Sequence, residues 1–379
     1  PPVTPAAVRP SVDPAPRTGD GLRIAFFGSS LVSAYWNGAA TYYRGIIRAL
    51  HARGHRVTFY EPDAFDRQKH RDLPDPDWAE VVVYEPASEA AVVGVVRRAA
   101  GADVVVKASG VGVYDALLEK AVLDLKAPNT RVVFWDVDAP ATLTSLDEDP
   151  GNPFRTLIPE YDLVCTYGGG DPIAGRYRAY GARACVPIYN AVDPDTHHPV
   201  DPDPRFAADL AFLGNRLPDR EQRVEAFFLR AAELLPDRRF LIGGNGWHDK
   251  PMPPNVADLG HVYTRDHNAL NCTPRAVLNI SRDSMASAGF SPATRVFEAA
   301  GAGACLITDR WPGLELFLEP GEEVLVAEDG EEVASILRDL DPERAADIGR
   351  RALGRVLREH TYMHRAALAE RVLSATPAR

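Results

Sequence analysis

The stretch SPATRVFEAAGAGACLITD, residues 291–309, has the pattern of a capped helix that runs directly into a buried strand. Ser291 is a favourable N-cap, and Pro292 suits the first helical position, where an N–H group has no partner inside the helix. The backbone N–H groups of such a first turn point outward and attract an anion, for example a phosphate. This segment therefore predicts a helix–strand unit with an anion site at its tip.

Three polar side chains share one face of the same expected helix. Glu298 stands four residues after Thr294 and three after Arg295, so the three side chains are neighbours on the helix surface. At about 1.5 Å per residue, Glu298 lies about 6 Å along the axis from Thr294. This arrangement suits a nucleotide, with the diphosphate at the helix tip and the ribose hydroxyls at Glu298. It equally suits an amphipathic helix whose glutamate is solvated.

Outward from this stretch, short apolar runs alternate with helical patterns, which indicates parallel sheets with helices on both faces. In the first half we expect strands at 22–27, 55–60, 80–84, 103–107, 131–135, 163–166 and 183–188, and helices at 37–53, 89–100, 114–125 and 173–180. In the second half we expect further strands at 210–213, 239–242, 256–259, 276–280 and 323–326, and helices at 220–235, 264–271, 330–340 and 342–374.

A turn-rich segment, residues 190–208, interrupts the alternation and has the composition of an interdomain linker. The expected organisation is a loose tail at 1–20, a Rossmann-like domain at 21–190, a linker at 191–208, a second Rossmann-like domain at 209–340 and closing helices at 341–379. One arrangement of those helices crosses back to the first domain. Two such α/β halves place a ligand cleft between the carboxyl ends of their strands.

Composition narrows the function classes. The chain has 379 residues, of which 45% are hydrophobic and 25% charged, as in soluble globular proteins of two domains. The net charge of −11 argues against a general nucleic-acid or membrane surface. The four cysteines form no C-x-x-C pair, and no apolar run approaches the ~20 residues of a membrane span. We expect a cytoplasmic protein without a metal site or disulfide framework.

Three motifs in order resemble those of a known family. They are AYGA (179–182) followed by PIYNAVD (187–193), then FLGNR (212–216), and then RVFEAAGAGA (295–304). Between Leu22 and about Leu340 the chain resembles the group 1 GT-B glycosyltransferases, particularly the CgeB-like spore-maturation branch. The resemblance implies the GT-B fold and transfer of a sugar from a nucleoside-diphosphate sugar to an acceptor hydroxyl or amine. It implies no metal and no other cofactor.

The resemblance also implies donor-binding residues in the second domain. Arg216 matches the diphosphate-binding arginine of the family and would stabilise the leaving group, while Arg220 replaces a lysine that the family places nearby. Tyr263 follows the position where the family holds the base, and it could stack on that base or be an ordinary half-buried aromatic residue. The other expected donor contacts are Gly214, Ser291, Thr294, Arg295 and Glu298.

The first domain offers candidate acceptor contacts. The segments GSS (28–30) and NGAA (37–40) resemble glycine loops of the family, so Ser29, Ser30, Asn37 and Gly38 are expected to face the cleft. Asp136 and Asp138 follow a buried strand, and either could take the proton of the acceptor hydroxyl, as a general base does. We favour Asp138 as the catalytic base. Either aspartate could instead cap the following turn.

One departure from the family pattern leaves alternatives open. Many retaining members carry two glutamates with seven residues between them; Glu298 matches the second, and Phe290 stands at the first. A sugar-nucleotide epimerase and a non-catalytic nucleotide-sugar-binding protein are therefore alternatives to a transferase. The sequence does not specify the base, the sugar, the acceptor, the stereochemistry or the oligomeric state.

Overall fold

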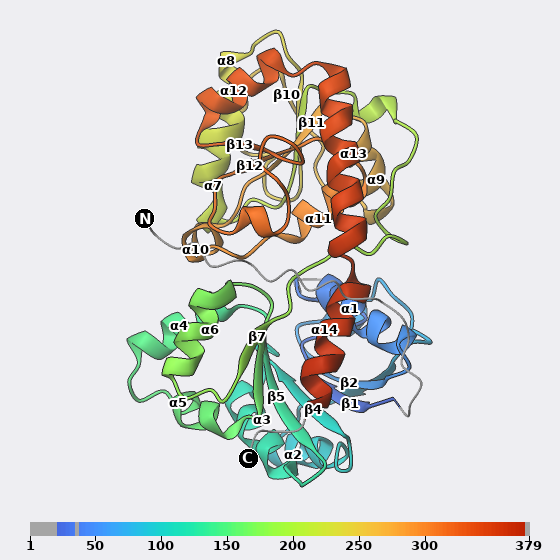
Figure 1. Ribbon diagram of the computed structural model, residues 1–379, viewed down its shortest axis with the longest axis vertical. Coiled ribbons are helices and arrows are strands. Elements are labelled where there is room, and N and C mark those ends of the chain that lie inside the picture. The colour runs from blue at the N-terminus through green and yellow to red at the C-terminus, as the bar shows by residue number, and fades with distance from the viewer. Residues whose placement is uncertain (1–20, 35–37, 376–379) are drawn as a thin grey trace, which may run out of the picture.

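The computed structural model describes residues 21–34 and 38–375 and has two lobes, each built around one parallel sheet (Figure 1). The expected tail at 1–20 lies outside the described residues. The two-sheet α/β architecture predicted from the sequence is confirmed.

The N-terminal lobe contains a seven-stranded sheet in the order β3-β2-β1-β4-β5-β6-β7. Its strands are β1 (Arg23–Phe27), β2 (Arg56–Pro62), β3 (Glu80–Tyr84), β4 (Val104–Ala108), β5 (Arg131–Asp136), β6 (Leu163–Thr166) and β7 (Cys185–Pro187). Its helices are α1 (Ala40–Ala52), α2 (Glu89–Arg97), α3 (Asp115–Ala121), α4 (Ala139–Glu148), α5 (Phe154–Leu157) and α6 (Gly170–Ala179). Helices α2 to α6 pack on one face of the sheet, and α1 packs on the other.

The C-terminal lobe contains a six-stranded sheet in the order β10-β9-β8-β11-β12-β13. Its strands are β8 (Leu210–Leu213), β9 (Phe240–Gly243), β10 (Val256–Asp258), β11 (Ala276–Asn279), β12 (Leu306–Asp309) and β13 (Leu325–Ala327). Its helices are α7 (Pro218–Val224), α8 (Arg230–Leu234), α9 (Thr264–Cys272), α10 (Asp283–Ala288), α11 (Thr294–Gly301) and α12 (Gly330–Asp339). Two closing helices, α13 (Pro342–Glu359) and α14 (Tyr362–Ser374), end the described chain.

The strand β4 illustrates why these apolar runs form central strands. Val105 packs into one core of the N-terminal lobe, while Val104 and Val106 pack into the core on the opposite face of the sheet. Successive side chains of a strand point to opposite faces, so a continuous valine run suits a strand that helices cover on both sides. In both lobes the carboxyl ends of the strands point toward the other lobe (Figure 1).

Two chain segments cross between the lobes side by side. The amide of Val192 donates to the carbonyl of His360 at 2.9 Å, and the amide of Tyr362 donates to the carbonyl of Val192 at 3.1 Å. Beyond this crossing, α13 packs on the C-terminal lobe and α14 packs on α1 of the N-terminal lobe (Figure 1). Gly45 permits the close approach, because a Cβ there would lie 2.3 Å from the Tyr362 ring.

Several element boundaries differ from the sequence predictions. The helix expected from Ser291 begins at Thr294 as α11, with Ala293 at its N-cap. The helix expected at 220–235 consists of α7 and α8 with a π-helical turn, Glu225–Leu229, between them. The one-turn helix α5 has no counterpart in the predictions, and neither do helices α4 and α10. Both are short segments that follow a strand end, where the hydrophobic period is too brief to identify a helix.

A buried ion pair fixes α14 to the N-terminal lobe, and its loss should destabilise the protein. The Nε atom of Arg53 lies 2.6 Å from a carboxylate oxygen of Glu370, and both side chains are buried. Glu370→Gln should lower the free energy of unfolding by about 3 kcal/mol in urea titrations, because a buried guanidinium loses its counter-charge. The control Glu331→Gln, which alters an exposed pair with Arg230, should cost less than about 1 kcal/mol. Equal losses in the two variants would contradict this role.

Candidate functional site

Two arginine side chains meet beside Gly214, directly after β8. A Cβ added to Gly214 would lie 2.8 Å from Nη2 of Arg295 and 3.0 Å from Nη1 of Arg220. A side chain at this strand end would therefore crowd both guanidinium groups. The position is the switch point of the C-terminal sheet, between β8 and β11, where α/β proteins bind ligands outside the carboxyl ends of the strands.

Fixed partners hold the Arg295 side chain in place. Its Nε atom donates to the carbonyl of Leu213 at 2.6 Å, and its Nη1 atom donates to Oδ1 of Asn279 at 2.9 Å. The guanidinium also lies over the Phe212 ring, 5.2 Å from the ring centroid. Burial, and secondarily the neighbouring Arg220 charge, lower the pKa of Arg295 to about 9. Two adjacent cations in a partly enclosed position make a suitable site for a phosphate or diphosphate.

Helix α7 carries Arg220 and is tied to the same sheet by a second arginine. Nη2 of Arg223 lies 2.6 Å from Oδ2 of Asp309, a fully buried carboxylate at the end of β12. The amide of Ser281 also donates to this carboxylate at 3.2 Å. Burial raises the pKa of Asp309 despite the Arg223 charge. This anchored carboxylate fixes the position of α7, and thereby that of Arg220 on the same helix.

The structure does not bring Arg216 to the pair formed by Arg220 and Arg295. Its Nη1 atom donates to Asp249 at 2.8 Å, and its Nη2 atom donates to Glu221 at 2.7 Å. Lys250 donates to the same Glu221 carboxylate at 2.6 Å. The Arg216 guanidinium is thus held by two carboxylates, and its contact with the diphosphate stays a prediction.

The first turn of α11 includes Arg295, but Ser291 does not cap this turn. The Ser291 hydroxyl donates to the carbonyl of Gly289 at 2.9 Å, and the side chain is buried. The helix begins three residues later, so Thr294 and Arg295 supply the amides of the first turn, which have no acceptor within the helix. The amides of these two residues are the candidate donors to an anion, whereas the Ser291 hydroxyl is engaged by the Gly289 carbonyl.

One turn further along α11, Glu298 keeps a partly exposed carboxylate. Nε2 of His197 lies 4.0 Å from its Oε1 atom. A second histidine, His267, bonds the carbonyl of Val262 at 3.2 Å, and burial lowers the pKa of its ring. A partly exposed carboxylate can accept hydrogen bonds from a pair of hydroxyl groups. On the loop that precedes α9, Tyr263 is 59% exposed, with the guanidinium carbon of Arg265 5.2 Å from its ring centroid and the His261 ring edge-on at 4.8 Å.

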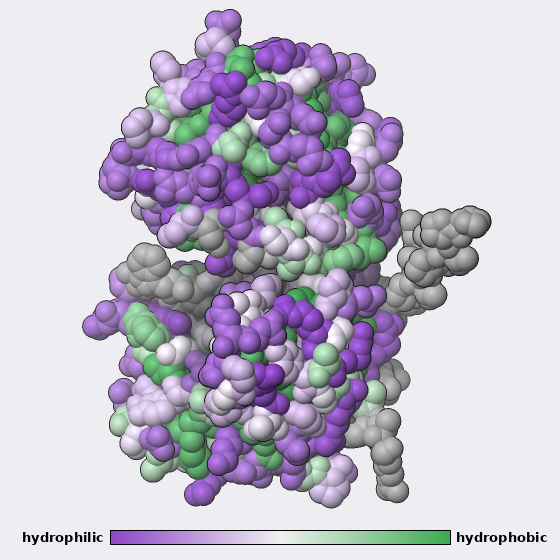
Figure 2. Space-filling view, turned by 90° about the vertical axis from the view of Figure 1, so that its left-hand side faces the viewer, coloured by the Kyte–Doolittle hydropathy of each residue, from purple (hydrophilic) through white to green (hydrophobic). Residues whose placement is uncertain are grey.

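Phe290 joins the two lobes through its backbone. It has a left-handed φ of 49°, its amide donates to the carbonyl of Pro312 at 2.6 Å, and its carbonyl accepts from the amide of Gly169 at 2.7 Å. A Cβ at Gly170 would lie 2.8 Å from the Phe290 ring, so glycine at that position admits the contact. The surface is indented between the lobes (Figure 2). Phe290 thus links the N-terminal lobe to the segment that precedes α11.

In the N-terminal lobe, Asp136 is buried and Asp138 is exposed. Asp136 has no exposed surface and accepts from the hydroxyls of Ser109, at 2.7 Å, and Tyr177, and from the amide of Asp138 at 2.9 Å. Burial raises the pKa of Asp136. The buried Asp136 carboxylate fixes the backbone of Asp138, which stands at the start of α4 without a side-chain capping bond, and the acceptor contact of Asp136 stays a prediction.

The serines of the first glycine loop are also buried. Ser29 is 2% exposed and Ser30 is 0% exposed. The Ser30 hydroxyl donates to Glu61 at 3.0 Å, and the carbonyl of Ser29 accepts from Arg67 at 2.9 Å. Both contacts hold the loop in place, and the acceptor contacts of Ser29 and Ser30 stay predictions. Gly38 is exposed before α1, and Asn37 lies outside the described residues.

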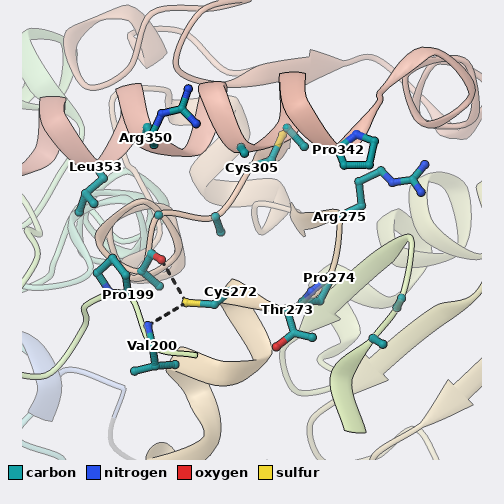
Figure 3. Close-up of a pocket in the computed structure, with 17 residues that line it drawn as sticks. Pro199, Val200, Cys272, Thr273, Pro274, Arg275, Cys305, Pro342, Arg350 and Leu353 are labelled. Carbon is teal, nitrogen blue, oxygen red and sulfur yellow. Dashed lines mark hydrogen bonds between the residues drawn. The ribbon is translucent and has the colours of Figure 1, made fainter. Parts of the chain in front are cut away.

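A pocket of about 580 Å³ lies at the opposite end of the C-terminal sheet (Figure 3). Its lining includes Ala208, Arg275 and Cys305, which precede β8, β11 and β12, so it opens at the amino ends of the strands. The thiol of Cys272 donates to the carbonyl of Ala302 at 3.1 Å (Figure 3). This pocket is separate from the pair formed by Arg220 and Arg295 at the carboxyl ends.

Sequence reasoning missed Asn279, which is fully buried and holds Arg295. The signal was an amide side chain at the last position of an apolar strand, where a polar group needs a partner. Among residues 21–34 and 38–375, no cluster of three His, Cys, Asp or Glu side chains is arranged to hold a metal ion. Within the same described ranges, no helix combines the length and apolar character that a membrane crossing requires.

Comparison with known proteins agrees with this architecture. Residues 220–371 match a family described as "Glycosyl transferase-like". The Anabaena protein Alr3699/HepE, solved in complex with UDP and glucose, superposes with a TM-score of 0.66 at 16% identity, over 93% of this chain and 99% of that one. Sucrose-phosphate synthase from Thermosynechococcus elongatus superposes with a TM-score of 0.66 at 14% identity, over 93% of this chain and 98% of that one. A search of curated protein sequences gives no match.

A third similar structure bears on the expected partners. An alpha-glucosyltransferase in complex with UDP and a 13-mer DNA superposes with a TM-score of 0.67 at 13% identity, over 94% of this chain and 100% of that one. Because that protein binds DNA, the fold itself gives no reason to exclude nucleic acid as a partner. The expectation of no nucleic-acid partner rests on net charge alone.

The chain has the GT-B fold of these solved structures, and residues 220–371 match the family described as "Glycosyl transferase-like". Neither finding addresses the CgeB-like branch.

The buried Asp136 gives a pH-dependent prediction. Because the pKa of Asp136 is raised in the folded protein, its contribution to stability is fully present below the unfolded pKa of about 4 and is lost as the pH rises through the folded pKa. Asp136→Asn removes this loss. The free energy of unfolding of the variant, minus that of the wild type, should therefore increase from about pH 4 to about pH 7 in urea titrations. A difference that is constant with pH would contradict a raised pKa.

Proposed function

We propose that this protein is a metal-independent glycosyltransferase that moves a sugar from a nucleoside-diphosphate sugar to an acceptor hydroxyl or amine. The observation that carries the proposal is the pair of guanidinium groups at Gly214, with the first turn of α11 beside them and Glu298 one turn below. We further propose a UDP-sugar as the donor. UDP or a UDP-sugar accompanies several of the solved structures that share the fold.

The proposed chemistry follows from the charges at the site. As the bond between the anomeric carbon and the phosphate oxygen breaks, negative charge develops on the nucleoside diphosphate that leaves. Arg220, Arg295 and the first amides of α11 would stabilise that charge, the task that a divalent cation performs in other enzymes. Glu298 would accept hydrogen bonds from the ribose hydroxyls, and Tyr263 would stack on the base.

The acceptor oxygen or nitrogen would form the new bond to the anomeric carbon and lose its proton. Asp138 is the proposed base because its carboxylate is exposed at the end of β5 and its backbone is fixed by the buried Asp136. Assignment to the CgeB-like branch and a cytoplasmic location remain predictions from the sequence. To contact the diphosphate, Arg216 would have to release its two carboxylate partners, Glu221 and Asp249.

Donor binding should depend on Arg220 and much less on Arg216. Arg220→Ala removes a charge-assisted contact worth about 1.5–3 kcal/mol, so the Kd for UDP should rise roughly 10- to 100-fold in isothermal titration calorimetry. The matched control Arg216→Ala removes a guanidinium bound by Glu221 and Asp249, so its Kd should change less than about threefold. The opposite order would show that Arg216 holds the diphosphate.

Asp138→Asn should separate chemistry from donor binding. The variant keeps the shape of the side chain but cannot take a proton, so we expect kcat to fall about 100-fold or more. The Kd for UDP should not change. Asp171→Asn, which alters an exposed aspartate at the start of α6, serves as the control and should keep full activity. An unchanged kcat in Asp138→Asn would remove Asp138 from the mechanism.

The function itself is tested by incubating the protein with UDP-glucose and other nucleotide sugars, with and without a panel of acceptors. Transfer predicts glycosylated acceptor and free nucleoside diphosphate in equal amounts. A nucleotide at 100 times its Kd should stabilise the fold by about 2.7 kcal/mol in thermal melts. Conversion of the nucleotide sugar without acceptor would indicate an epimerase, and binding without turnover would indicate a non-catalytic protein. Either result would overturn the proposal.

A further inference from the structure

The non-glycine residues with a left-handed backbone conformation lie in loops at the strand ends that face the other lobe. Among the residues that the structure describes, the non-glycine positions with positive φ are Phe65, Asp66, Tyr114 and Phe290. The first three lie on loops that follow β2 and β4 of the N-terminal lobe. A left-handed conformation costs about 1–2 kcal/mol for a residue with a side chain, and such strain persists where the surrounding structure enforces it, often at functional sites.

Phe65 combines this strain with exposure. Its φ is 57°, and 56% of its surface is open to solvent. Folding normally buries a phenylalanine ring, since its transfer from water is favourable. Here the backbone is held in a costly conformation, yet the Phe65 ring does not pack in either core of the lobe.

The Phe65 ring is nevertheless fixed from below. The guanidinium carbon of Arg67 lies 5.1 Å from the ring centroid. Arg67 is buried, and its Nη1 atom donates to the carbonyls of Ser29 at 2.9 Å and of Val111 at 3.1 Å. A Cβ at Gly112 would lie 2.8 Å from Cε2 of Phe65, so the ring edge rests directly on that loop. Arg67 thus joins the loops after β1, β2 and β4 beneath one aromatic ring.

The loop under the ring is itself anchored. Asp115 accepts from the amides of Val111, at 3.1 Å, and Gly112, at 2.7 Å. The same carboxylate pairs with Nζ of Lys107 at 2.5 Å, and Lys107 is fully buried at the end of β4. A buried ammonium group therefore holds the loop that supports Phe65. Such a support makes the exposed ring a preorganised surface.

The position of this surface is that of a ligand site. The N-terminal sheet changes direction between β1 and β4, and the loops joined by Arg67 include those after both strands. In open α/β sheets ligands bind at such a switch point. The loop after β4 also carries Ser109, which bonds the Asp136 carboxylate that positions Asp138. The ring therefore stands at the same edge of the sheet as the proposed base.

We propose that Phe65 is the platform on which the acceptor stacks, and that the acceptor presents a six-membered ring with an apolar face. Either a pyranose, through its C–H face, or an aromatic group supplies that chemistry. Arg67 and Gly112 occupy the inner side of Phe65, so the acceptor ring meets the outer side. This inference rests on the proposed transferase function, because it assigns the acceptor of that reaction.

The test measures binding of small probes to the UDP-saturated full chain by isothermal titration calorimetry. The probes are methyl glucoside for a pyranose, 4-nitrophenol for an aromatic ring and sorbitol for a polyol without a ring. Phe65→Gly removes the ring and keeps a backbone that adopts left-handed φ without cost, so the loop stays folded. Phe65→Trp keeps an aromatic face. Leu316→Ala, which alters an exposed side chain of the C-terminal lobe, is the matched control.

We expect one of the two ring probes to bind, with a Kd that rises about tenfold in Phe65→Gly and recovers in Phe65→Trp. Leu316→Ala should have no effect, and sorbitol should not distinguish the variants. The ring probe that responds identifies the source, sugar or aromatic. The inference is overturned if neither ring binds at millimolar concentration, or if Phe65→Gly leaves the Kd unchanged. If the wild type does not bind UDP, the proposed function itself is refuted. The two failures are therefore distinguishable.

Discussion

The central constraint on the C-terminal lobe is the close approach of two guanidinium groups, those of Arg220 and Arg295. Like charges repel, and burial adds to the cost of keeping Arg295 charged, so that its pKa falls to about 9. The surrounding structure offsets that cost with fixed acceptors, the Leu213 carbonyl and the Asn279 amide oxygen. Gly214 supplies the room. A diphosphate bound between the two groups would relieve the remaining repulsion, and this makes an anion the natural ligand of the site.

The rest of the fold places this pair opposite a second, differently built surface. Each sheet changes direction between two central strands, β1 and β4 in one lobe and β8 and β11 in the other. The C-terminal switch point holds cations, whereas the N-terminal one holds the exposed ring of Phe65 near the Asp136–Asp138 segment. Phe290 connects the lobes through its hydrogen bond with Gly169. The arrangement suits a charged donor on one side and an acceptor with an apolar ring on the other.

The amino-acid sequence predicted the strands well because a valine-rich run such as β4 has few alternatives to a buried parallel strand. It also predicted that Arg295 and Glu298 share one helix face, because helical spacing depends only on positions that are close in the sequence. It did not foresee contacts between side chains that are far apart in the sequence. Arg216 turns toward Asp249, and Ser30 turns toward Glu61, partners that lie 33 and 31 residues away. Ser291 failed as a cap because the left-handed Phe290 redirects the chain just before it.

The most direct test of the central claim is a crystal structure of the protein with UDP bound. The account predicts that oxygens of the diphosphate lie within hydrogen-bonding distance of both Arg220 and Arg295, with the ribose hydroxyls on Glu298. Repulsion between the two guanidinium groups is then balanced by the ligand. A diphosphate that instead contacts Arg216, or that binds away from Gly214 altogether, would contradict the account.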